Sequence, residues 1–131
     1  MSPPPSGGHS TKQSRILRLL DRFLGGEALA ECPISTLDGV RAADVGWYSE
    51  ERFREVEGQL VFEQAPEICV EVLSPSNTIR EMEEKRALYF EAGAEEIWLC
   101  DEHGAMRFYQ RATPADVRSA SSRCPDFPGR L

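Results

Sequence analysis

Two short apolar segments, residues 68–73 and 97–100, constrain the fold of this chain more than any other feature. The first reads Ile-Cys-Val-Glu-Val-Leu and ends at a Ser-Pro pair, and the second reads Ile-Trp-Leu-Cys. Short apolar runs of this kind are typical of strands that are buried on both faces in the middle of a sheet. Between them, a capping box at Thr78 and Glu81 and a stop at Gly93 predict a helix over 78–92. A helix between two buried strands predicts a crossover connection.

The rest of the chain predicts further strands around this centre. Asp38-Gly39 is a strong hairpin signal. The expected elements are a helix over 10–24, strands over 28–35, 40–47 and 105–110, a loop over 1–9 and an irregular tail over 112–131. A chain of 131 residues suits one core. We therefore expect a single domain over 1–131 of the α/β (α+β) class, with a mixed central β-sheet flanked by helices.

Charge is unevenly distributed along the chain. The formal net charge of −7 argues against tight, nonspecific binding of nucleic acid. Basic residues nevertheless gather at the two ends, because the part after residue 102 has five arginines and two aspartates. On the expected helix over 10–24, one face carries four bases: Lys12, Arg15, Arg18 and Arg22. An ordinary solvated face and a phosphate-contacting stripe are both open at this point.

Membrane and zinc-binding classes are disfavoured by composition. No segment approaches the roughly 18 consecutive apolar residues that a membrane span requires, so a cytoplasmic protein without a membrane partner is expected. The four cysteines form no CxxC pair, and the only histidines are His9 and His103. A structural zinc site would need clustered ligands of these types.

Two acidic residues interrupt apolar strand patterns. Glu71 lies in the middle of the run over 68–73, where an ionised carboxylate is costly unless it is paired or bound to a metal. Asp44 lies inside the strand expected over 40–47, although aspartate is depleted in strands. If the two strands are neighbours, the carboxylates converge, and paired oxygen ligands suit Mg²⁺. A salt-bridged core glutamate, or an edge strand with one wet face, is the alternative.

Lys85 breaks the pattern of the expected helix over 78–92. It lies within the apolar sector, between Leu88 on one side and Met82 and Tyr89 on the other. Such a lysine usually extends to the edge of the helix. Alternatively its ammonium points at Asp44 and Glu71, where it would orient a water or stabilise a developing phosphorane.

These segments together resemble the Uma-two family, which belongs to the PD-(D/E)XK superfamily of restriction-endonuclease-like folds. The resemblance is carried by 43–45 (ADV), 67–76 (EICVEVLSPS), 85–93 (KRALYFEAG), 96–101 (EIWLCD) and 124–129 (CPDFPG). Two positions differ from the expected pattern: Leu73 stands where the superfamily has a lysine, and Ala43 where a proline is expected. The resemblance also implies that the N-terminal part of the family domain is missing here.

The resemblance implies a restriction-endonuclease-like fold and a metal-dependent nuclease. Asp44 and Glu71 would be the metal ligands, and Lys85 the catalytic lysine. The cofactor implied is Mg²⁺ or Mn²⁺, and the reaction is hydrolysis of phosphodiester bonds in nucleic acid, most simply DNA. A homodimer is expected as well. The alternative function is a non-catalytic interaction module on a nuclease-like scaffold, in which the three residues serve folding alone.

Overall fold

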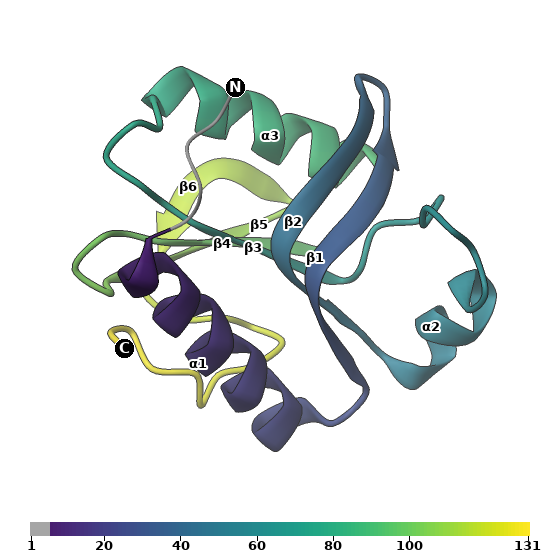
Figure 1. Ribbon diagram of the computed structural model, residues 1–131, viewed down its shortest axis with the longest axis horizontal. Coiled ribbons are helices and arrows are strands. Elements are labelled where there is room, and N and C mark those ends of the chain that lie inside the picture. Colours follow the sequence, from purple (N-terminus) through teal and green to yellow (C-terminus); the bar gives the residue numbers. More distant parts are fainter. Residues whose placement is uncertain (1–5) are drawn as a thin grey trace.

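A six-stranded mixed sheet with helices on both faces forms the molecule (Figure 1). The computed structural model describes residues 6–131. In chain order the elements are α1 (Gly7–Leu24), β1 (Glu27–Thr36), β2 (Gly39–Tyr48), α2 (Glu50–Val56), β3 (Ile68–Val72), α3 (Ile79–Glu91), β4 (Glu96–Cys100), β5 (Met106–Gln110) and β6 (Thr113–Arg118). This arrangement confirms the expected fold class.

The strands lie in the sheet in the order of the sequence, β1 to β6. Every neighbouring pair is antiparallel except β3 and β4, which α3 connects in parallel. A parallel pair needs a crossover of this kind, because a tight turn can only join antiparallel strands. All ten residues of β3 and β4 are buried, as the two apolar segments predicted.

Each face of the sheet has its own apolar core. On one face, α1 and the C-terminal segment pack over the middle strands through Ile16, Leu20 and Phe127, which enclose Trp98 and Phe108. On the other face, α3 contributes a second set of apolar side chains, namely Met82, Tyr89 and Phe90, packed with Ile97 and Leu99. Figure 1 shows α1 and α3 on opposite sides of the sheet. Both helices are therefore fixed relative to the same two central strands.

Buried carboxylates anchor the starts of β3 and β4. Glu67 accepts a hydrogen bond from the Ser49 amide and lies near the guanidinium groups of Arg52 and Arg123, at 3.7 and 3.6 Å. The Glu96 carboxylate accepts three hydrogen bonds, from the Trp98 ring nitrogen, the Ser121 hydroxyl and the Arg123 amide. Both side chains are nearly fully buried. We refer to this group as the arginine-paired end.

Two boundaries differ from the sequence expectation. The expected loop over 1–9 was wrong for Gly7 to His9, which are helical because Ser6 is the N-cap and accepts from the His9 amide. Residues 1–5 of that loop lie outside the described residues. The expected irregular tail was also wrong in part, since Thr113–Arg118 forms β6 against β5. Its side chains are mostly exposed, so no apolar alternation in the sequence predicted it.

No helix in the described part of the chain is long and apolar enough to span a membrane.

Candidate metal centre

Glu71 lies at the centre of the candidate site. Only 4% of the residue is exposed, and its backbone belongs to β3, a strand in which every residue is buried. One oxygen, Oε1, accepts a hydrogen bond from the Tyr89 hydroxyl at 2.7 Å and lies 3.4 Å from the Lys85 ammonium. Both partners come from α3. They are four residues apart, so they lie one turn apart on the same face of the helix. The helix that connects β3 and β4 thus directs two side chains at the same carboxylate.

The environment of Glu71 favours its protonated form. Burial is the main cause, and the nearby Asp44 carboxylate adds to it, whereas Lys85 and Tyr89 oppose it. Together these effects raise the pKa of Glu71 from 4.5 to about 8. One ammonium, 30% exposed, therefore does not offset the burial of one carboxylate beside another. Additional positive charge at this point would stabilise the ionised pair.

Asp44 reaches the same place from β2. The antiparallel pairing of β2 and β3, in which Val45 faces Val70, brings Asp44 next to Glu71. Its Oδ2 accepts a hydrogen bond from the Val72 amide at 2.7 Å and lies 3.3 Å from the ring nitrogen Nε2 of His9. The side chain of Asp44 is 16% exposed, so it lies between the core and the solvent. The predicted convergence of the two carboxylates is thus present.

His9 and Glu31 complete the surroundings of Asp44. His9 lies in the first turn of α1, and its second ring nitrogen, Nδ1, is buried without a hydrogen-bond partner among the described residues. Glu31 lies opposite Asp44 in the hairpin, with a left-handed φ of 51° that is unusual for a residue other than glycine. The Gln13 side-chain amide donates to both, at 3.2 Å to Glu31 Oε1 and 2.7 Å to the Asp44 carbonyl. No residue pattern in the sequence reveals the strained backbone of Glu31.

A pocket of about 940 Å³ opens over these side chains, between the start of α1 and the start of α3. Asp44, Glu71 and Lys85, the three residues singled out in the sequence, all line it. The turn over 72–77 forms one wall. The pocket has more acidic than basic lining residues: Glu31, Asp44, Glu71, Glu81 and Glu102 against Lys12 and Lys85. Such a lining favours a cation and disfavours an anion that arrives alone.

The donor set fits a hard divalent cation held by few protein ligands. Carboxylate oxygens are the ligands that Mg²⁺ uses, and Mg²⁺ commonly keeps several waters beside one or two carboxylates. Within residues 6–131 no cluster of three or more histidine, cysteine, aspartate or glutamate side chains has the geometry of a metal site. Asp44 and Glu71 would therefore form the protein part of an incomplete coordination sphere. The raised pKa of Glu71 supports this fit, because a neighbouring cation reverses the cost of two adjacent carboxylates.

The model of the Uma2 family, whose description is "Putative restriction endonuclease", matches residues 1–129. The chain belongs to this family, which confirms the resemblance seen in the sequence. No curated protein matches the chain.

The fold also matches that of a solved structure. A crystal structure described as "a putative nuclease belonging to DUF820 from Anabaena variabilis ATCC 29413" has a TM-score of 0.75 to this chain at 19% identity. The match covers 92% of this chain and 73% of that one. At such identity the likeness concerns the fold alone. Family and fold together indicate that the chain belongs to the class of restriction-endonuclease-like nucleases.

Proposed function

We propose that this protein is a Mg²⁺- or Mn²⁺-dependent endonuclease that hydrolyses phosphodiester bonds in DNA. The observation that supports it best is the pair of adjacent carboxylates, Asp44 and Glu71, in an open pocket with Lys85 against one of them. Membership of the Uma2 family supports the same class of reaction. If Asp44 and Glu71 served the fold alone, an open pocket over them would be a disadvantage, because solvent weakens their electrostatic contacts with neighbouring groups.

The protein residues have separate tasks in this proposal. Asp44 and Glu71 would hold the metal, which when bound would supply an activated water and neutralise charge on the phosphate. Tyr89 donates to Glu71 and thereby fixes the direction of its carboxylate. The amide of Val72 and the ring of His9 hold Asp44 in the same way. Lys85 is partly exposed at the pocket wall, where its ammonium can orient a water or stabilise negative charge that develops on the phosphoryl oxygens.

The proposal is tested by calorimetric titration of Mg²⁺ and Mn²⁺ into wild-type protein and a Glu71→Gln variant. The expected result is binding by the wild type that disappears in the variant. Circular dichroism of both proteins controls for folding. A folded wild-type protein that binds neither cation, and cleaves no DNA in their presence, would contradict the proposal.

A non-catalytic interaction module is the second candidate, and one observation favours it. Asp44 Oδ2 already accepts from the Val72 amide and lies near His9, so part of its capacity serves the fold. In that case Asp44→Asn would lower stability without any effect on cation binding. A titration on the Asp44→Asn variant separates the two candidates directly.

A homodimer is a further part of the proposal. A symmetric pair of chains would present two sites, one for each strand of a duplex. Light scattering at several protein concentrations tests this point. A monomeric mass throughout would remove the dimer and leave the chemistry of each site unchanged.

A further inference from the structure

The outer side of α1 is strongly basic, in contrast to the acidic chain as a whole. The helix has four bases, Lys12, Arg15, Arg18 and Arg22, and its only acid is Asp21. At 100° per residue the four bases fall within a sector of about 120°, so they form one continuous row along the helix. We call this row the α1 basic face. Its three arginines are exposed, and Lys12 is partly buried.

The arginines of the α1 basic face have no acidic partner, unlike four other arginines of the described chain. Arg41, Arg52, Arg80 and Arg123 each form an ion pair with an aspartate or glutamate. Within the described part of the chain, Arg15, Arg18 and Arg22 form none. Their positive charge is therefore not neutralised within the protein, which leaves it available to an anionic partner.

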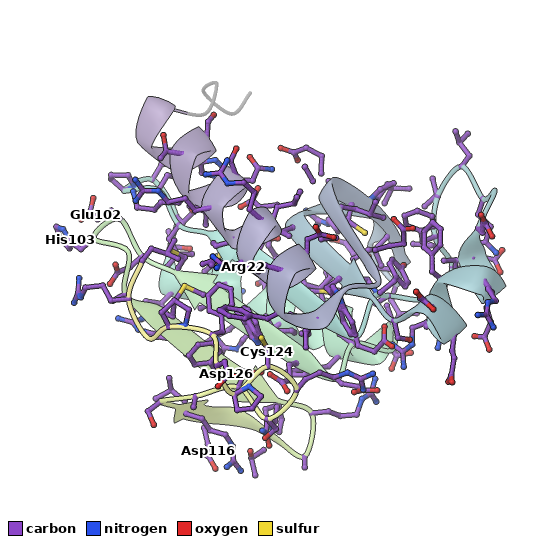
Figure 2. The ribbon with its side chains drawn as sticks, turned by 90° about the horizontal axis from the view of Figure 1, so that it is seen from below. Arg22, Glu102, His103, Asp116, Cys124 and Asp126 are labelled. Atoms are coloured by element: carbon purple, nitrogen blue, oxygen red, sulfur yellow. The ribbon has the colours of Figure 1, made fainter. Side chains whose placement is uncertain are left out.

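Two further observations connect the α1 basic face to pockets in the surface. Lys12 lines the pocket that contains Asp44 and Glu71, so the row begins at the candidate metal centre. At the other end, a hollow of about 480 Å³ lies between α1 and the C-terminal segment, where Arg15, Arg18 and Arg22 are joined by Arg130. Figure 2 shows Arg22 on α1 and Cys124 and Asp126 on the segment beside it. The hollow also has apolar lining, from Leu19 and Pro128.

We propose that the α1 basic face binds the phosphate backbone of duplex DNA and leads one strand into the pocket at Asp44 and Glu71. This inference rests on the proposed nuclease function. From Lys12 to Arg22 the helix rises about 15 Å, and phosphates of one B-form strand follow each other at about 3.4 Å along the axis. The row therefore spans about four phosphates on one side of the scissile bond. Contacts of this type position a duplex without reading its sequence.

The test measures binding separately from cleavage. A fluorescent duplex of about 20 base pairs, long enough to cover the row, is titrated into three proteins that all carry Glu71→Gln, and fluorescence anisotropy is followed at several salt concentrations. The first protein has no other change, the second adds Arg18→Gln and Arg22→Gln, and the third adds Arg54→Gln and Arg118→Gln. The last pair is the matched control, because Arg54 and Arg118 are exposed on α2 and β6 and the change in net charge is the same.

We expect the α1 variant alone to lose affinity, by about tenfold at low salt, with the slope of log affinity against log salt reduced by about 1.8. Equal effects in both double variants, or no binding by the first protein, would overturn the inference. Cleavage with Mg²⁺ is scored independently, in the wild type and in an Arg18→Gln, Arg22→Gln variant that retains Glu71. Binding through α1 without cleavage by the wild type would overturn the nuclease proposal alone. Equal cleavage by these two proteins would overturn the proposal for the α1 basic face alone.

Discussion

The two ends of β3 hold buried carboxylates in opposite ways. At the arginine-paired end, Glu67 contacts two guanidinium groups and a backbone amide. At the other end, Glu71 has a hydroxyl and a partly exposed ammonium near one oxygen, and a second carboxylate beside it. Glu67 and Glu71 are equally buried, at 3% and 4%. The difference therefore teaches that burial alone does not mark a functional acid, whereas incomplete compensation next to a pocket does.

The largest expected effect is a difference in cleavage activity between variants at the two ends of β3. Glu71→Gln should lower Mg²⁺-dependent cleavage by about 10³-fold, because several kcal/mol of transition-state stabilisation depend on the metal. Glu67→Gln is the matched control, since it is the same substitution near the same strand at the same burial. Cleavage rates per folded molecule, with the folded fraction from circular dichroism, provide the measurement. Similar losses in both variants would show that the two ends do not differ in function.

The arginine-paired end should dominate stability. Arg52→Ala leaves Glu67 buried without one of its two guanidinium partners and removes two hydrogen bonds, to the Ala65 and Gly93 carbonyls. We expect a loss of about 3–5 kcal/mol in the free energy of unfolding. Urea unfolding followed by tryptophan fluorescence measures it. The exposed pair of Arg80 and Glu84 is the control, where Arg80→Ala should cost about 0.5 kcal/mol or less. A loss below about 1 kcal/mol for Arg52→Ala would contradict this assignment.

The pH dependence of the metal-free protein should come from the Glu71 end. The pKa of Glu71 is about 8 in the folded protein and 4.5 as an ordinary carboxyl, so the folded state retains its proton over this range and the unfolded state does not. The contribution of Glu71 to the free energy of unfolding is therefore fully present below about pH 4.5. It is lost as the pH rises towards 8, which lowers the free energy of unfolding by a few kcal/mol. Urea unfolding with a chelator at both ends of the range measures the slope. The slope should vanish in Glu71→Gln and persist in Glu67→Gln.

The smallest expected effect concerns Tyr89. Tyr89→Phe removes the hydroxyl that donates to Glu71 at 2.7 Å, so the ionised form of Glu71 loses a partner. We expect a further rise in the pKa of Glu71 and a loss of about 1 kcal/mol in unfolding free energy, larger at alkaline than at acidic pH. Unfolding curves at the two pH extremes reveal it. A loss that is the same at both extremes would mean that Tyr89 acts through packing alone.

The central part of the fold and the convergence of the site could be predicted from the sequence for physical reasons. The runs over 68–73 and 97–100 are buried on both faces, so their composition alone identifies the strands. Glu71 stood out because an acid in such a run needs a special environment. That signal was enough to predict that Asp44, Glu71 and Lys85 meet, although their roles are still predictions.

Other features depend on tertiary contacts that leave no local pattern. β6 is mostly exposed, and it forms because β5 offers a free edge rather than because its own residues alternate. The left-handed φ of Glu31 falls in the middle of β1, and no residue type at this position specifies it. The arginine-paired end joins Glu67 to Arg123, which is 56 residues away (123 − 67). No spacing within the sequence specifies such a pairing.

The short ladder between β2 and β3 has a consequence for the rate of unfolding. Only three residue pairs join these strands, and they link the β1–β2 hairpin to the β3–α3–β4 unit, each of which is built from contacts close in sequence. Asp44 belongs to the hairpin and Glu71 to the crossover unit, so a cation between them would bridge the seam. It would have to leave before the two units separate, and unfolding would slow as its concentration rises while folding keeps its rate. Under the proposed function, the metal would thus also act as a kinetic clamp between two halves of the sheet.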